Sequence, residues 1–211
     1  LASMMASGYE PVSSMGSDIP LAVLSQQAQH ISNYFKQEFA QVTNPPIDPL
    51  REKFYMTLAC YLGSEGDILT IKPENAKRIF LISPALDKSK YLKVLNSPSI
   101  GYKVGFIQAI FNANDEAHLQ KSIVALCKEA ASLVNTGIDI LVINNTDIAE
   151  SIAAIPSMMI VGAIHHHLIT NGLRRRVSLV VNGGDIIEAH HVACLLSYGA
   201  DAVYPSLSIK T

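Results

Sequence analysis

The side chains best suited to metal chemistry lie near the C-terminus. In a helix, His190 would share a face with Cys194, and Glu188 a face with His191, because residues three or four positions apart are neighbours on a helix surface. Imidazole, thiolate and carboxylate groups at these spacings can bind zinc or iron, which would suit a metal-dependent hydrolase. The chain has no HExxH and no CxxC motif, however. The other interpretation is that these histidines are buried where helices meet a sheet and bond backbone carbonyl groups, and we expect no metal ion.

A turn between a predicted strand and a predicted helix is the feature most suited to a cofactor. Gly183 and Gly184 have no side chain, so the backbone there could approach a phosphate at the start of a helix. The chain would then be a stand-alone β/α protein that binds flavin or a phosphorylated metabolite. Asp185 argues against this function, because its carboxylate would cap the helix and compete with the phosphate. GxGxxG is also absent, so we expect a tight turn and no cofactor in this chain.

Three consecutive arginines, Arg174–Arg176, could bind an anion. They follow Gly172, which is expected to end a helix. The arginines could therefore complement the negative end of that helix instead, or form a basic corner that faces another domain.

Nucleophilic catalysis has little support in the sequence. Cys60, Cys127 and Cys194 are scattered, as is typical of reduced and buried thiols. There is no GxSxG motif and no P-loop. The chain by itself is predicted to lack a catalytic centre.

The elements that position these residues begin with a helical segment over residues 20–62. Apolar residues recur at helical spacing, which predicts a helix over about 21–40. Pro45 and Pro46 must end this helix, because proline has no amide hydrogen and restricts the residue before it. Asp48 as N-cap and Pro49 as first helical residue predict a second helix over about 49–62.

The corner between these two predicted helices has a fixed geometry. It would hold backbone carbonyl groups and the side chains of Thr43 and Asn44 in one place. From the residues alone, the corner is either a well-defined turn between helices or a binding element.

The rest of the chain is predicted to be a single α/β core over residues 63–211, and residues 1–19 an irregular arm. Continuous apolar runs such as IDILVIN and VSLVV are typical of parallel strands covered on both faces. The expected class is α/β, with a mostly parallel open sheet or a partial βα-barrel and helices packed around it. The predicted strands are 78–83, 102–111, 138–144, 177–182 and 202–205, and the predicted helices are 116–135, 156–170 and 185–198.

Composition narrows the classes of partner. The 211 residues suffice for one domain with a sizeable core, and 49% of them are hydrophobic and only 16% charged. The net charge of −2 and the lack of a basic stripe exclude nucleic acid. The longest nearly uncharged window, residues 151–164, is too short to span a membrane, and no signal peptide is visible.

Several blocks of sequence resemble the large chain of glutamate synthase. The first blocks are SMGSDIPLAVLS at 14–25 and YFKQEFAQVTNPPIDPLRE at 34–52. The later blocks are VGAIHHHLITNGLR at 161–174, EAHH at 188–191 and YGADAVYP at 198–205. They keep the order of the family and bracket nearly the whole chain. Family members usually read ESGEAR where this chain reads NGGDII at 182–187, so one Glu and one Arg are missing here.

The resemblance implies a segment of a longer polypeptide, the central domain between a glutamine amidotransferase domain and an FMN-binding synthase domain. FMN and an iron–sulfur cluster would belong to the parent enzyme, which would lie in the cytoplasm or a plastid. A reductase subunit or ferredoxin would be its partner. The central domain would have an architectural role and contribute to the tunnel for ammonia. The resemblance implies that Thr43 and Asn44 line or gate this tunnel, supported by Lys36, Gln37, Asp48 and Arg51.

Overall fold

The computed structural model describes residues 2–8, 21–36, 47–67, 69–70, 72–114 and 118–210. The α-helices are α1 (Ala2–Ser7), α2 (Pro49–Tyr55), α3 (Lys88–Leu95), α4 (His118–Asn135), α5 (Ser157–Thr170), α6 (Ala189–Ser197) and α7 (Ser206–Lys210). The strands are β1 (Cys60–Leu62), β2 (Ile79–Leu81), β3 (Val104–Gln108), β4 (Ile110–Asn112), β5 (Ile140–Asn144), β6 (Ile152–Ala154), β7 (Ser178–Asn182) and β8 (Ala202–Tyr204).

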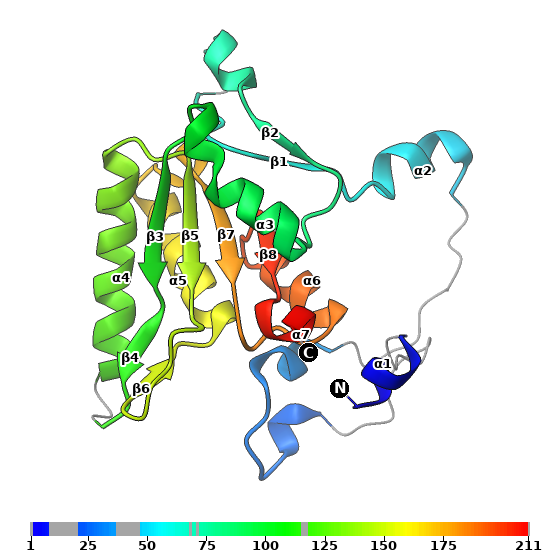
Figure 1. Ribbon diagram of the computed structural model, residues 1–211, viewed down its shortest axis with the longest axis vertical. Helices are drawn as coiled ribbons and strands as arrows, with labels where there is room; N and C mark the ends of the chain where they lie inside the picture. The colour runs from blue at the N-terminus through cyan, green and yellow to red at the C-terminus, as the bar shows by residue number, and fades with distance from the viewer. Residues whose placement is uncertain are drawn as a thin grey trace.

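The centre of the fold is a four-stranded parallel sheet in the order β3-β5-β7-β8 (Figure 1). Each new strand is added beside the previous one, always on the same side. Right-handed crossovers then place the connecting helices α4, α5 and α6 on one face of the sheet. Among the described residues the strands form an open sheet and no closed barrel. The predicted α/β class with a mostly parallel open sheet is confirmed.

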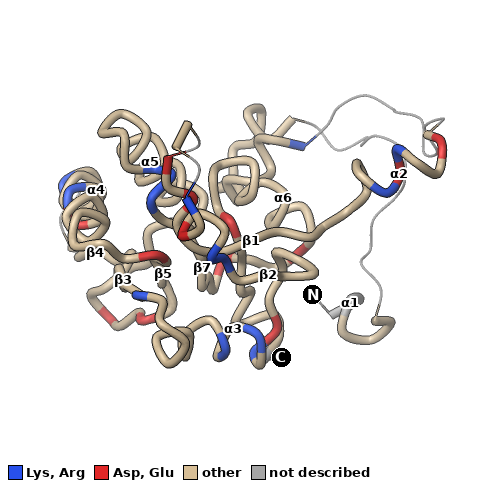
Figure 2. The backbone as a smooth tube through the Cα atoms, turned by 90° about the horizontal axis from the view of Figure 1, so that it is seen from above, with Lys and Arg blue, Asp and Glu red and all other residues tan. Residues whose placement is uncertain are grey.

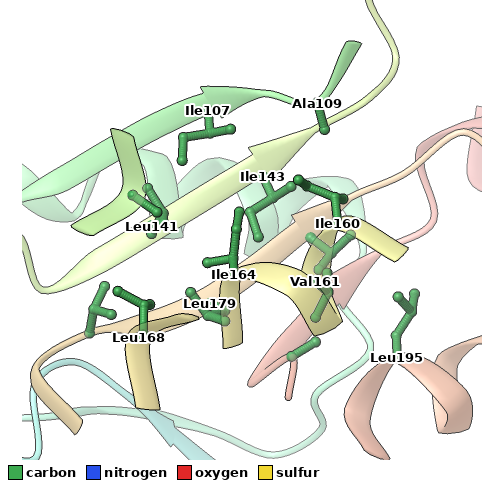
Figure 3. Close-up of a cluster of buried hydrophobic side chains, with 14 of the residues drawn as sticks. Ile107, Ala109, Leu141, Ile143, Ile160, Val161, Ile164, Leu168, Leu179 and Leu195 are labelled. Carbon is green, nitrogen blue, oxygen red and sulfur yellow. The ribbon is translucent and has the colours of Figure 1, made fainter. Parts of the chain in front are cut away.

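The helix-covered face of the sheet holds the larger hydrophobic core. Ile107, Leu141 and Leu179 come from three neighbouring strands and point toward the helices (Figure 3). Ile164 and Leu168 of α5 meet them and are fully buried. Branched apolar side chains of this size contribute about 1.5–3 kcal/mol each when they are removed from water, so this layer dominates the stability of the fold.

The other face of the sheet is covered by α3 and by the antiparallel pair β1–β2. Val142 and Val180 of the sheet pack there with Leu62 and Leu81. Both faces of β5 and β7 are therefore buried, which explains the continuous apolar runs in their sequences.

The predicted helices and strands of the core are largely confirmed. The strands predicted at 138–144, 177–182 and 202–205 are β5, β7 and β8, and the helices predicted at 116–135 and 156–170 are α4 and α5. The helix predicted at 185–198 begins later, at Ala189.

Two predictions in the helical segment are wrong. Residues 21–36 form the short 3₁₀ helices η1 (Ala22–Leu24) and η2 (Ile31–Phe35) instead of an α-helix. Side chains compete with the helix here, since the Ser25 hydroxyl accepts the Gln27 amide and His30 accepts the Ser32 amide. The helix predicted at 49–62 ends at Tyr55, because Cys60–Leu62 pairs with β2 instead.

The first two predicted strands of the core also need correction. The strand predicted at 102–111 is two strands, β3 and β4. The chain changes partner at Ala109, whose amide donates to Asn144 and whose carbonyl accepts the Ile155 amide, and β4 then pairs with β6 in a separate antiparallel ladder. The strand predicted at 78–83 is β2, which lies outside the parallel sheet. Sequence patterns missed α3, which Asp87 caps by accepting the Lys90 amide.

Candidate functional site

The residues expected to form the tunnel entrance are only partly described by the structure. Gln37, Thr43 and Asn44 lie outside the described residues. Lys36 is described, and its Nζ lies 3.8 Å from Oε1 of Glu188, just before α6. The structure therefore places Lys36 beside the start of α6.

Asp48 and Arg51 follow the stretch 37–46 in the sequence, where α2 begins. Oδ1 of Asp48 accepts the amides of Leu50 and Arg51 at 3.1 and 2.9 Å, so Asp48 is the predicted N-cap. Nε of Arg51 lies 3.1 Å from the other carboxylate oxygen of Asp48. Both side chains are exposed, and their described contacts serve to start the helix.

Two histidines hold residues 30–32, which precede the stretch 37–46 in the sequence, against α6 and the turn after β7. Nε2 of His190 on α6 donates to the carbonyl of Ser32 at 2.9 Å. Nε2 of His30 donates to the carbonyl of Asp185 at 3.1 Å, and its ring stacks on His191. We refer to His30, Ser32, His190 and His191 as the histidine anchor. The prediction that His190 bonds a backbone carbonyl is confirmed.

His191 is the buried histidine of the anchor. Its Nδ1 accepts the amide of Ile187 at 3.1 Å, and its Nε2 lies 3.5 Å from Glu188. Burial lowers the pKa of His191, and the neighbouring His30 adds to this effect. The surroundings of His191 therefore favour its neutral imidazole ring.

The histidine and cysteine side chains near the C-terminus make contacts with other groups of the protein. Sγ of Cys194 lies 3.6 Å from Nε2 of His190, whose hydrogen is directed to Ser32. Nδ1 of His165 accepts Nε of Arg174 at 2.9 Å. Throughout the part of the chain that the structure describes, no three His, Cys, Asp or Glu residues lie together in a way that could hold a metal ion.

The turn at Gly183 and Gly184 is filled by side chains of the chain itself. A Cβ atom at Gly183 would lie 2.5 Å from Cδ1 of Ile186 and 2.6 Å from the Ser157 hydroxyl. The amide of Gly184 donates to Oδ1 of Asn145 at 2.9 Å. The turn does not lead directly into a helix, since α6 begins only at Ala189. This arrangement offers a phosphate neither open space nor a helix N-terminus.

Asp185 caps a different helix from the one expected. Its Oδ2 accepts the backbone amide of Ser157, the first residue of α5, at 2.8 Å. Its Oδ1 accepts the Ser157 hydroxyl and, at 3.1 Å, the Asn145 side chain. The carboxylate thus occupies the position that an anion would take at the N-terminus of α5.

A row of polar side chains, which the sequence patterns did not reveal, lies at the carboxyl ends of the strands. Gln108, Asn144, Asn182 and Tyr204 are paired in register on neighbouring strands. Asn144 donates to Gln108 at 2.8 Å, and Asn182 donates to Asn144 at 2.9 Å. The signal that could have revealed this row is the asparagine that ends both apolar runs, IDILVIN and VSLVVN.

The three arginines differ in what they contact. Arg174 lies inside the fold, where it donates to the carbonyls of Val177 and Gly199 and pairs with Asp201 at 2.9 Å. Arg175 reaches outward and pairs with Glu65 at 3.3 Å. Arg174 therefore has a structural role, and only its neighbours remain available to a partner.

Helix α2 presents apolar side chains to solvent. Leu50 and Phe54 are 78% and 76% exposed and share one face at spacing i, i+4. Figure 1 shows α2 to the side of the sheet. The outer face of the β1–β2 pair carries exposed Tyr61 and Phe80, whose rings lie 5.4 Å apart. No helix among the described residues is long and apolar enough to cross a membrane.

Comparison with known proteins shows which family the chain belongs to. A family model described as the glutamate synthase central domain matches residues 1–211. The chain belongs to the glutamate synthase central domain family. The resemblance found in the sequence blocks is thereby confirmed.

Relatives of this central domain occur in plants, bacteria and fungi. The ferredoxin-dependent glutamate synthase of Spinacia oleracea, described as chloroplastic, is 41% identical over 213 residues, which cover 99% of this chain and 13% of the relative. The glutamate synthase [NADPH] large chain of Bacillus subtilis is 40% identical over 206 residues, which cover 97% of this chain and 13% of the relative. The glutamate synthase [NADH] of Schizosaccharomyces pombe is 38% identical over 213 residues, which cover 100% of this chain and 10% of the relative.

Proposed function

We propose that this central domain connects the amidotransferase and synthase domains of a longer glutamate synthase and forms part of the ammonia passage between them. The chain spans only about 13% of the length of the plant and bacterial relatives that it matches. The reaction of the parent enzyme, the synthesis of glutamate with ammonia from glutamine, is part of this proposal. The names of the relatives include ferredoxin, NADPH and NADH, so the proposal leaves the electron donor and the compartment open.

The observation that carries the proposal is the exposed apolar face of α2. Leu50 and Phe54 project from a helix whose side chains are all exposed. An apolar stripe on a helix normally packs against another surface, and the described part of this chain supplies none. A neighbouring domain of a longer polypeptide would cover it.

The anchored segment and the capped helix support a passage at the stretch 37–46. The histidine anchor and the Lys36–Glu188 pair hold the chain before this stretch, and Asp48 starts α2 after it. We propose that Thr43 and Asn44, which lie between these two described segments in the sequence, line the passage between two domains. Gln37 would lie at the entrance of the same stretch.

The catalytic groups of the parent enzyme would belong to the neighbouring domains. An iron–sulfur cluster requires several cysteine thiolates around one centre. Cys60 packs with the core under β1 and β2, whereas Cys127 and Cys194 lie in the core on the other face of the sheet. These three thiols do not fit a cluster. The Gly183 turn is closed by its own side chains and does not fit FMN.

The proposal is tested in the longer polypeptide that contains this chain. Leu50→Asp together with Phe54→Asp should weaken the contact of α2 with the neighbouring domain. We expect glutamine hydrolysis to continue while glutamate formation falls, so that the amount of glutamine hydrolysed exceeds the amount of glutamate formed. The two products are measured in the same reaction.

Val124→Asp is the matched control, because Val124 is an exposed apolar residue on α4. It should leave the two amounts equal, as in the unaltered enzyme. Equal amounts in the α2 variant, with both rates unchanged, would contradict the proposal that α2 lies at a domain contact.

A further inference from the structure

We propose that a basic cleft at the end of the sheet where the strands begin binds a small phosphorylated anion. The cleft has a volume of about 430 Å³ and lies between residues 65–78 and the arginine segment before β7. Its charged lining residues are Glu65, Lys72, Arg78 and Arg175. We refer to it as the arginine cleft. It lies at the opposite end of β7 from the histidine anchor, and the proposed tunnel role does not use it.

The charges in the arginine cleft do not balance. Oε1 of Glu65 lies 3.1 Å from Nη1 of Arg78, and Oε2 lies 3.3 Å from Nη2 of Arg175. A single carboxylate thus serves two guanidinium groups. Lys72 adds a third positive charge and makes no ion pair with a described residue. The four side chains together leave an excess of two positive charges.

Both arginines also have a hydrogen-bond donor that is not used. Nη2 of Arg78 donates to the carbonyl of Tyr61 at 2.8 Å. Nε of Arg78 and Nε of Arg175 are buried and have no acceptor among the described residues. A buried donor without an acceptor is unfavourable, especially on a charged group, so an oxyanion that supplies acceptors would be stabilised here.

Asp67 is a further acid close to the arginine cleft. Asp67 lines a second cavity of about 680 Å³ on the other side of Arg175. Its carboxylate accepts the Thr70 hydroxyl at 2.7 Å and the Leu69 amide at 2.9 Å. These hydrogen bonds lower the pKa of Asp67, and Arg175 and Lys72 lower it further. Because Arg176 also lines the second cavity, the excess of positive charge remains with both acids included.

A phosphate group matches this arrangement better than a carboxylate. Glu65 already takes the place of a carboxylate between the two guanidinium groups. Arg78, Arg175 and Lys72 line the cleft, and a phosphate offers three acceptor oxygens and up to two negative charges to them. The open side of the cleft leaves room for the small molecule that carries the phosphate. Figure 2 shows basic and acidic parts of the tube close together between the labels α5 and β7.

Calorimetric titration with inorganic phosphate and with pyrophosphate tests the proposal, at constant ionic strength maintained with chloride. We expect saturable binding at one site. Arg175→Gln should weaken it by roughly tenfold to a hundredfold, the loss expected for a charge-assisted hydrogen bond. Glu65→Gln should strengthen it, because the two guanidinium groups are released from their internal carboxylate.

Lys128→Gln and Glu129→Gln are the matched controls, since both residues are exposed on α4 and make the same changes in net charge. They should leave the affinity unchanged. The proposal would be overturned by no saturable binding, by equal effects of cleft and control variants, or by a poly-glutamate peptide that binds where phosphate does not. If circular dichroism shows that Arg175→Gln is unfolded, Lys72→Gln tests the proposal instead, because Lys72 is exposed and its side chain makes no ion pair with a described residue.

Discussion

The imidazole ring of His30 lies parallel to that of His191, with the ring centroids 4.1 Å apart and 7° between the planes. Nδ1 of His30 accepts from Ser32, and its Nε2 faces the Asp185 carbonyl, an arrangement that requires a neutral ring. Two neutral rings can stack, whereas two imidazolium ions would repel each other. The contact between η2 and α6 is thus linked to the protonation state of its histidines.

We expect the free energy of unfolding to decrease as the pH falls below about 6.5. Burial and His30 lower the pKa of His191, and burial and Arg174 lower the pKa of His165. The unfolded chain therefore binds protons at a pH where these two folded rings remain neutral. This contribution to stability is complete above about 6.5 and is lost as the pH falls from there to the lowered pKa values. Urea unfolding at a series of pH values from about 6.5, the pKa of a free histidine, downward measures this decrease in the free energy of unfolding.

His191→Asn should make this pH dependence shallower. An asparagine oxygen can replace Nδ1 as acceptor for the Ile187 amide, but it does not titrate. The charged and titratable groups around the ring, His30, His190 and Glu188, stay in place. The control is His167→Asn, at a half-buried position on α5, which should keep the slope of the unaltered protein. The same slope in both variants would mean that His191 does not cause the pH dependence.

His190→Ala should release η2 from α6. The carbonyl of Ser32 loses the imidazole donor, and we expect a loss of about 1–2 kcal/mol in the free energy of unfolding. Amide hydrogen exchange in residues 31–36 should become faster, while exchange in β5 and β7 stays slow. His166→Ala, the matched histidine on an exposed site, should change neither quantity. Unchanged exchange in η2 after His190→Ala would show that other contacts hold this segment.

The central sheet could be predicted because its signal is local. The apolar runs of β5 and β7 are continuous, and Gly199, at φ 109°, marks the turn into β8. The 3₁₀ turns of residues 21–36 could not be predicted from periodicity, because Ser25 and His30 bond nearby backbone amides and compete with the helix.

The contacts of the candidate site could not be predicted from the sequence pattern, because they join residues that are distant in the chain. The sequence predicts that the histidines near the C-terminus bond carbonyl groups, but Ser32, the partner of His190, is distant in the chain. Asp185 was expected to cap the helix that follows it. Its carboxylate reaches α5 instead, because parallel strands place the turn after β7 beside the start of the helix that follows β5. The proximity of Asp185 to the start of α5 follows from the order of the strands and not from a local sequence pattern.

Asp185→Ala should be more destabilising than the loss of an ordinary helix cap. The variant leaves the amide and the hydroxyl of Ser157 without their carboxylate acceptor in a largely buried place. We expect a loss of about 2–4 kcal/mol, from about 1 kcal/mol for the cap and the rest for the unpaired groups. Asp87→Ala, at the exposed N-cap of α3, should cost only about 1 kcal/mol. Chemical denaturation measures the free energy of unfolding of both variants. Equal losses would contradict the proposal that the buried hydrogen bonds of Asp185 add to its effect as a cap.

Thr43→Trp and Asn44→Trp test the proposed ammonia passage in the longer polypeptide. A bulky side chain at either position should narrow the passage without touching the chemistry in the neighbouring domains. We therefore expect glutamine hydrolysis to persist, glutamate formation from glutamine to fall, and glutamate formation from added ammonia to fall much less. Gln27→Trp, on an exposed site of the same segment, is the control and should leave all three rates unchanged. If both tryptophan variants kept glutamine hydrolysis and glutamate formation equal, the passage would have to run elsewhere, because ammonia that escapes into solvent is diluted before it can react.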